Sequence, residues 1–175
     1  MPGLEHTAAG QSCRDALARQ RDLQRAFGEP VTDIPTGSAA RVIHSQAEKL
    51  VRHLFFCGEY TLEDDGVDGS AAFQEAFRAN RHASGDGRSL KDFQLLNRLF
   101  KYRCSYMIYS KTFAALPQLL RLEVSIQLDR VLKGEDQRPG FAHLSPGERQ
   151  TIQKILVETR PEGWLQIPGA PSEFP

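Results

Sequence analysis

The chain has 175 residues, with 22 basic and 22 acidic side chains, and 40% of its residues are hydrophobic. This length and composition are typical of a globular domain and exclude an intrinsically disordered chain. Because the formal net charge is zero, no global field attracts nucleic acid or an anionic membrane, and we expect no nucleic-acid partner. No apolar run approaches the roughly 20 residues of a membrane span, so none is predicted.

The N-terminal residues MPGLEHTAAGQSC lack the basic and apolar regions of a signal peptide. They predict a cytoplasmic protein if the chain is complete, and a periplasmic or exported one if it is a fragment of a longer protein. The three cysteines, Cys13, Cys57 and Cys104, are odd in number and widely spaced. This pattern fits a reducing compartment better than a disulfide framework.

The N-terminal half predicts two helices of different character. Residues 12–27 carry a sparse apolar stripe on a charged segment, so we expect a peripheral helix followed by a connector, together spanning 1–37. Residues 39–57 have apolar side chains at the spacing of one helical face. Ser38 is the predicted N-cap of this helix and Gly58 its C-cap.

Two long loops and two further helices follow. An acidic, glycine-rich loop precedes a helix over 71–80, for which Ser70 is the predicted N-cap. A second loop precedes Ser89, which is the predicted N-cap of a helix over 90–100.

The C-terminal part carries the clearest helix signals. A helix is predicted to start after Pro117 and to end at Gly134. Ser145, Pro146 and Glu148 form a capping box with proline at the first helical position, predicting a helix that ends near Arg160. We therefore predict an all-α fold: a single irregular helical domain of about six helices with two long loops, its core over 38–160 and an irregular proline-rich tail over 161–175.

The segment LNRLFKYRCSYMIYSKTF, residues 96–113, predicts a central buried helix. Tyr102, Tyr106 and Tyr109 stand at i, i+4 and i+7, which places their rings on one helical face. Aromatic and basic residues in alternation can also bind single-stranded nucleic acid, but the neutral charge argues against this. The three tyrosines are weak candidates for cofactor binding, and we expect no cofactor.

The sequence offers weak candidates for chemistry. Cys104 is a candidate nucleophile, but its apolar neighbours favour an inert buried thiol. His53 is a weak catalytic candidate, and with Cys57 it forms an i, i+4 pair that could hold a metal. Because further ligands are missing, no metal site is predicted.

From about Val51 to Arg160 the chain resembles a segment of bacterial proteins without an assigned activity. The resemblance rests on GRSLKDFQLLNRLFKYRCSYMIYSKTFAALP, VLKGED and FAHLSPGERQTIQKILVETRPEG. In those proteins it usually forms the C-terminal part of longer, often exported chains, some with c-type cytochrome regions upstream. The pattern usually has proline where this chain has Arg103 and an acidic residue where it has Ala114, so a helix break near Cys104 is an alternative to one continuous helix.

Three functions remain open. The leading hypothesis is a non-enzymatic helical interaction or assembly module with a protein partner. The resemblance implies, as an alternative, an accessory subunit or domain of a haem-containing redox system. A cysteine-dependent enzyme is the second alternative, and an enzyme is the less expected outcome.

Overall fold

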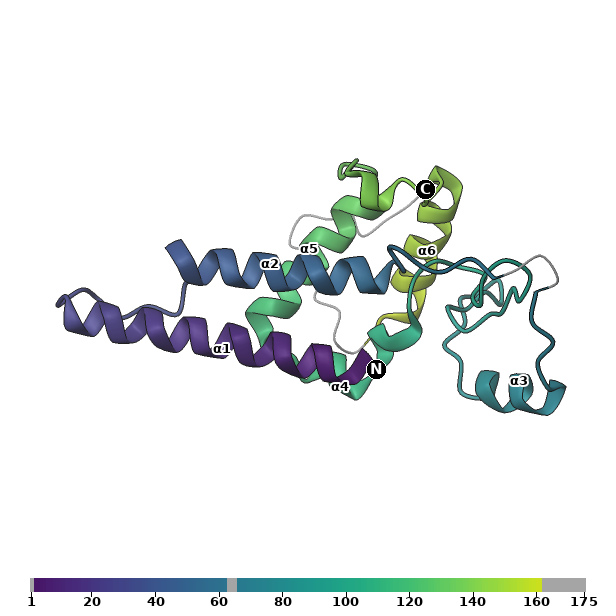
Figure 1. Cartoon of the computed structure of the whole chain (residues 1–175), viewed down its shortest axis with the longest axis horizontal. Helices are drawn as coiled ribbons and strands as arrows, with labels where there is room; N and C mark the ends of the chain where they lie inside the picture. Colours follow the sequence, from purple (N-terminus) through teal and green to yellow (C-terminus); the bar gives the residue numbers. More distant parts are fainter. Residues whose placement is uncertain (1, 63–65, 162–175) are drawn as a thin grey trace. The chain divides into compact units, whose positions relative to one another are not determined.

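The computed structural model describes residues 2–62 and 66–161, and side chains from residue 8 onward. The described residues form six α-helices and two short 3₁₀ helices and contain no β-strand, which confirms the predicted all-α class (Figure 1). The elements in chain order are α1 (Pro2–Ala26), α2 (Gly37–Leu54), α3 (Ala71–Arg78), η1 (Tyr106–Tyr109), α4 (Lys111–Ala114), α5 (Gln118–Leu132), η2 (Pro139–Phe141) and α6 (Pro146–Thr159). No helix in these ranges combines the length and apolarity needed to cross a membrane.

The described chain divides into two compact units, each built from separate chain segments. The first unit comprises 2–51 and 109–128, and the second comprises 52–108 and 129–161. The predicted tail over 161–175 lies outside the described residues except for Pro161.

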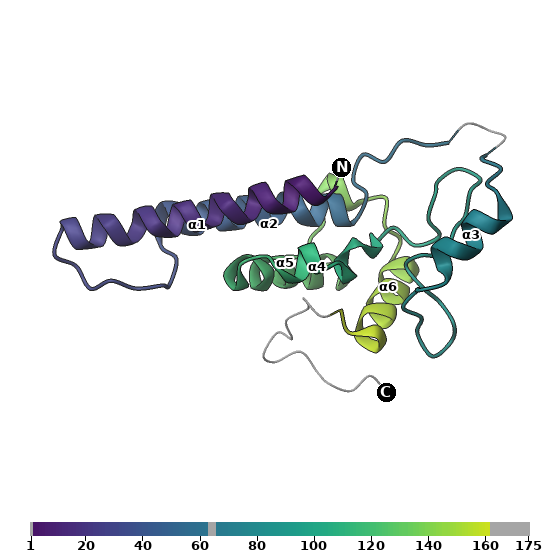
Figure 2. The same ribbon diagram turned by 90° about the horizontal axis from the view of Figure 1, so that it is seen from below.

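In the first unit, α1 and α2 run side by side in opposite directions (Figures 1 and 2). α1 begins at Pro2, upstream of the predicted start at residue 12, and ends before Gly28, whose φ is 69°. Ser38 is not the N-cap of α2, because the helix already begins at Gly37 and the Thr36 carbonyl accepts the Ala39 amide at 3.0 Å. The core of this unit consists of buried side chains from α1, α2, α4, the turn after α4 and α5: Ala9, Cys13, Leu17, Ala39, Ile43, Ala47, Leu50, Val51, Phe113, Leu116, Leu120, Val124 and Leu128.

The second unit has its own core, formed where the end of α2 meets the end of α5 and α6. Its buried side chains are Leu54, Phe55, Leu90, Tyr102, Cys104, Ile108, Val131, Leu132, Phe141, Leu144, Ile152, Ile155 and Leu156. The Arg149 guanidinium donates to the carbonyls of Val131, Phe141 and Leu144 at 3.0–3.1 Å, which ties the start of α6 to the loop before it. Carbonyl groups at the ends of helices and turns have no N–H partner within the helix, and Arg149 supplies the missing donors here.

The helices predicted over 90–100 and 96–113 are wrong in the structure. The chain turns back at Leu95, whose φ is 61° and whose amide donates to the Arg98 carbonyl at 2.9 Å. Phe93 and Phe100 then form an isolated antiparallel bridge. The next helices are η1 and α4, so the stretch is broken on both sides of Cys104.

Aromatic packing explains why this segment is not helical. The turn brings Phe93 and Phe100 into a stack with ring centroids 5.7 Å apart, and Phe77 of α3 lies 5.0 Å from Phe93. Tyr106 meets the Phe77 ring edge-on at 5.2 Å. Each such pair adds about 0.5–1.5 kcal/mol beyond its area burial, so this tertiary cluster outweighs a local helix preference.

Candidate anion-binding cavity

The structure places Cys104 where it cannot react while the fold is intact. Its side chain is fully buried, and burial raises the pKa of its thiol to about 12. The neighbouring Arg103 is engaged elsewhere, since its guanidinium donates to the His143 carbonyl. The predicted burial of this thiol is observed, and its inertness stays a prediction.

The predicted pair of His53 and Cys57 does not share a helical face. α2 ends at Leu54, and Phe56 adopts φ 52°, so Cys57 lies in the turn beyond the helix. Burial raises the pKa of the half-buried Cys57 thiol. Across the described ranges, no group of three or more His, Cys, Asp or Glu side chains could hold a metal ion.

The three tyrosines do not form one line. Tyr102 is buried in the second unit, and Tyr106 belongs to the half-buried aromatic cluster of that unit. Tyr109 belongs to the first unit. The common face predicted for them depended on a continuous helix, which the turn at Leu95 and the short η1 replace.

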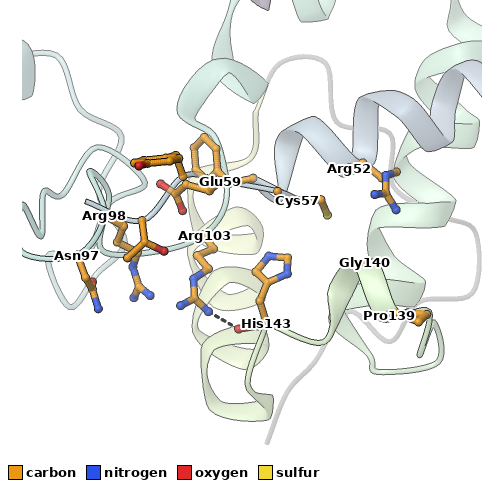
Figure 3. Close-up of a pocket in the computed structure, with 13 residues that line it drawn as sticks. Arg52, Cys57, Glu59, Asn97, Arg98, Arg103, Pro139, Gly140 and His143 are labelled. Atoms are coloured by element: carbon orange, nitrogen blue, oxygen red, sulfur yellow. Dashed lines mark hydrogen bonds between the residues drawn. The ribbon is translucent and has the colours of Figure 1, made fainter. Parts of the chain in front are cut away.

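A concave site rich in arginine lies within the second unit and was not predicted. It is a cavity of about 350 Å³ formed by the turn after α2, the turn at 97–98, Arg103 and the loop around η2 (Figure 3). This volume is within the range of small-ligand sites, roughly 300–1,000 Å³. The lining residues are Arg52, Phe56, Cys57, Gly58, Glu59, Tyr60, Thr61, Asn97, Arg98, Arg103, Pro139, Gly140 and His143.

The turn after α2 sets one wall of the cavity. The Cys57 amide donates to the Arg52 carbonyl at 2.9 Å, and Gly58 adopts φ 81°, a conformation that favours glycine. The chain then pairs with the second wall, because the Leu62 amide donates to the Asn97 carbonyl at 2.9 Å. Gly58 was predicted as a helix C-cap, and it serves instead as a turn residue beyond Leu54.

Arg52 reaches the cavity because Gly140 has no side chain. A Cβ atom at Gly140 would overlap the Arg52 guanidinium and lie 3.2 Å from its Cζ. The Arg52 guanidinium has no hydrogen-bond or ion-pair partner in the described part of the chain, so its donors are available to a ligand.

Arg98 and Arg103 lie on the other side of His143 from Arg52 (Figure 3) and are held by internal contacts. Arg98 donates to the carbonyls of Phe100 and Lys101 at 3.0 and 2.9 Å. The Glu148 carboxylate accepts the Arg103 amide at 2.9 Å and lies 3.5 Å from the Arg103 guanidinium. These contacts fix both cations before any ligand arrives.

His143 is oriented by the backbone. Its Nε2 lies 2.8 Å from the Phe55 carbonyl oxygen, which can only accept, so Nε2 carries the proton. In the neutral ring Nδ1 is then an acceptor. This arrangement fixes one tautomer and keeps the imidazole at the cavity wall.

The lining carries an excess of positive charge. Three guanidinium groups and the carboxylate of Glu59 line the cavity. The Glu148 carboxylate, outside the lining, lies 3.9 Å from the Arg98 guanidinium and 3.5 Å from that of Arg103, so one net positive charge is left when Glu59 is ionised. Burial raises the pKa of Glu59 even though Arg98, Arg103 and His143 act in the opposite direction. An anionic ligand would therefore gain cationic partners in a partly desolvated site.

Comparison with family models, with curated proteins and with solved structures gave no match for this chain. The resemblance of residues 51–160 to bacterial proteins therefore stays a prediction. The chemistry of the cavity rests on its own geometry.

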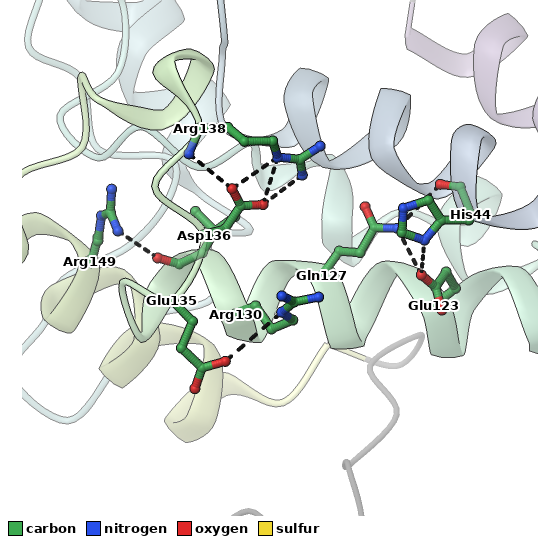
Figure 4. A network of polar contacts seen from close by, with 9 residues as sticks. His44, Glu123, Gln127, Arg130, Glu135, Asp136, Arg138 and Arg149 are labelled. Atoms are coloured by element: carbon green, nitrogen blue, oxygen red, sulfur yellow. Dashed lines mark hydrogen bonds and ion pairs between the residues drawn. The ribbon is translucent and has the colours of Figure 1, made fainter.

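A second polar cluster, in the first unit, joins α2 to α5 (Figure 4). His44 Nδ1 lies 2.8 Å from the Glu123 carboxylate, and the buried Gln127 donates from Nε2 to the same oxygen at 2.8 Å. Gln127 also donates to the His44 carbonyl at 3.2 Å. The contacts cross-link the two helices.

Proposed function

We propose that the chain is a non-enzymatic helical binding module whose cavity in the second unit receives an anionic group, a carboxylate or a phosphate. The observation that carries this proposal is the convergence of Arg52, Arg98 and Arg103 on one cavity of about 350 Å³. Guanidinium groups match the planar donor pattern of both anions and are the preferred residues for such recognition.

The cysteines support binding rather than covalent catalysis. A nucleophilic thiol requires a lowered pKa and access to solvent. Cys104 is buried, and the pKa of Cys57 in the cavity is raised rather than lowered. His143 is committed through Nε2 to a backbone carbonyl.

The proposal is tested by titrating the protein with sulfate and following the amide signals of Gly58 and Gly140 by NMR. Saturable shifts are expected at both glycines, because both line the cavity. Arg52→Ala should weaken binding by about tenfold, since one charge-assisted hydrogen bond contributes about 1.5–3 kcal/mol. Arg52 is the best position to change because its removal leaves no internal partner unpaired.

The matched control is Arg41→Ala, which removes an exposed arginine from the same helix outside the cavity. It should leave sulfate binding unchanged. If wild-type protein shows no saturable shifts at the cavity glycines, or if Arg52→Ala binds sulfate as tightly as wild type, the proposal is wrong.

A second candidate function, self-association, is favoured by exposed apolar residues at the end of the α1–α2 pair. Phe27 is 75% exposed and Ile34 is 71% exposed, with Leu23 and Val31 nearby in sequence and about half exposed. Gln20 fixes this connector, because its side chain donates to the Ile34 carbonyl and accepts the Thr36 amide, each at 2.9 Å.

We infer that a second copy of the chain covers this surface. Because the formal net charge is zero, two copies of the chain do not repel each other through their net charge. Sedimentation velocity over a concentration series should show a dimer that Phe27→Ser weakens. Val157→Ser, at an exposed apolar position in α6, is the control. A strictly monomeric wild-type protein would remove this candidate.

A further inference from the structure

Exposed apolar residues occur in the same two chain segments as residues that line the arginine-lined cavity. Tyr60, which lines the cavity, is 81% exposed. Leu96 and Leu99 flank the lining residues Asn97 and Arg98 in the sequence and are 67% and 44% exposed. Large apolar residues gathered beside a charged cavity mark a binding surface more often than isolated ones do.

The backbone holds these apolar residues in an ordered arrangement. Leu96 and Leu99 lie on the tight turn in which the Gln94 amide donates to the Leu99 carbonyl at 3.0 Å. The segment after Tyr60 pairs with this turn, because the Val67 amide donates to the Leu95 carbonyl at 2.8 Å.

Gly66 permits the close approach of these two segments. Its φ is 67°, and a Cβ atom at this position would overlap the Leu95 carbonyl oxygen. The apolar side chains are therefore presented by a fixed scaffold, which lowers the entropy cost of binding.

We propose that the cavity and these exposed apolar residues together bind an acidic segment of another protein, with a carboxylate side chain in the cavity and a neighbouring apolar side chain on Tyr60, Leu96 and Leu99. This inference rests on the proposed function and names its ligand class. The positive charge of the lining complements any anion, including a carboxylate. The feature that selects a peptide over a small free anion is the set of exposed apolar residues, because a free anion would leave them uncovered.

The arginines and the exposed apolar residues have different roles in the proposed recognition. Arg52 supplies unengaged donors, whereas Arg98 and Arg103 supply fixed charge held by backbone carbonyls and by Glu148. The exposed apolar residues supply the area that is removed from water on binding, and its burial favours association. Binding should therefore weaken with salt, but it should not be abolished by salt.

The test uses the full chain and a fluorescein-labelled peptide of alternating glutamate and leucine, measured by fluorescence polarisation. A matched peptide with glutamine in place of every glutamate reports the charge contribution, and glutarate and phosphate serve as unlabelled competitors. We expect the acidic peptide to bind at least tenfold more tightly than the glutamine peptide or glutarate. Arg52→Ala, Tyr60→Ser and Leu96→Ser should each weaken it by about fivefold or more.

Val157→Ser is the matched control, because Val157 is 44% exposed in the same unit but does not line the cavity. Tyr60, Leu96 and Leu99 are exposed, so their substitution should leave the urea unfolding curve close to that of wild type.

The outcomes separate the two proposals. If glutarate or phosphate binds as tightly as the peptide, and the Tyr60→Ser and Leu96→Ser variants bind like wild type, the peptide inference is overturned while the anion-binding function stands. If no anion and no peptide binds, both fail. Binding of the glutamine peptide as tightly as the acidic one would also overturn the inference.

Discussion

At the residue scale, Gly140 shows how a missing side chain can place a charge. Its backbone lies against the Arg52 guanidinium, and any Cβ there would displace that group. Gly147, at the start of α6, has open space around it. The two glycines therefore make a matched pair for testing whether the position of Arg52, and not only its charge, matters.

We predict that Gly140→Ala weakens sulfate binding by several-fold although every arginine is retained. Gly147→Ala should leave binding unchanged and stabilise the fold by up to about 1 kcal/mol, because alanine is the better helix former. The measurements are an NMR sulfate titration and a urea unfolding curve for each variant. Equal sulfate affinity in the two variants would mean that the Arg52 position is unimportant.

Glu59 gives a prediction about pH. Burial raises the pKa of this carboxyl above its ordinary value of 4.5, against the opposing effect of Arg98, Arg103 and His143. A carboxyl whose pKa is raised in the folded state favours folding below that pKa and disfavours it above. Protonation also removes the single negative charge of the lining, so sulfate binding should tighten as the pH falls from 7 toward 5.

We predict that Glu59→Gln binds sulfate more tightly than wild type at pH 7 and has a flatter pH profile. Sulfate is the appropriate probe because its own charge is constant in this range. Because the two proteins differ at residue 59 alone, the difference between their pH profiles isolates Glu59. Parallel profiles for the two proteins would contradict the assignment.

At the element scale, α6 begins as its sequence predicts but uses one residue differently. Ser145 is the N-cap, and its Oγ accepts the Glu148 amide at 3.2 Å, as expected of a capping box. The Glu148 carboxylate does not return to the cap. It accepts the Arg103 amide instead. The Glu148 part of the capping box therefore makes a contact with a residue distant in the sequence.

We predict that Ser145→Ala costs about 1 kcal/mol of the free energy of unfolding through loss of the cap. Glu148→Gln should cost about 1–3 kcal/mol, because it weakens charge-assisted contacts with Arg103 in a poorly exposed site. Urea unfolding measures both. An effect of Glu148→Gln much smaller than that of Ser145→Ala would show that the contact with Arg103 contributes little.

The segment over 93–105 shows where element prediction failed. Its apolar spacing fits a helix, but helix formation would separate Phe93 from Phe100 and dismantle their packing against Phe77. The Lys91 ammonium adds to this cluster, since it lies 4.7 Å from the centre of the Phe77 ring. Such pairing is invisible in the local pattern because its partners are distant in sequence.

At the scale of the whole molecule, each unit has its own core and contains a buried cysteine. Cys13 belongs to the first unit and Cys104 to the second, and burial raises the pKa of Cys13 to about 11 and that of Cys104 to about 12. Cys57 is half-buried in the cavity wall. The three thiols therefore report on three different environments.

We predict that iodoacetamide labels Cys57 first in the native protein at pH 8. Cys13 and Cys104 should be labelled at least about tenfold more slowly, because their thiols must first be exposed by opening of the fold. Mass spectrometry of peptides after timed quenching gives the three rates, and labelling in urea is the control for intrinsic reactivity. Rapid native labelling of Cys104 would revive the hypothesis of a cysteine nucleophile.

The sequence by itself determined the all-α class, the apolar face of α2 and the start of α6. These features follow from interactions between residues a few positions apart in the sequence. The spacing of Ile43, Ala47 and Leu50 predicts the apolar face, and Ser145 predicts the helix start. The site was decided by the tertiary structure alone. Arg52, Arg98 and Arg103 line one cavity only because turns, a bridge and Gly140 bring separate chain segments together. Contacts at such sequence separation leave no periodic signal.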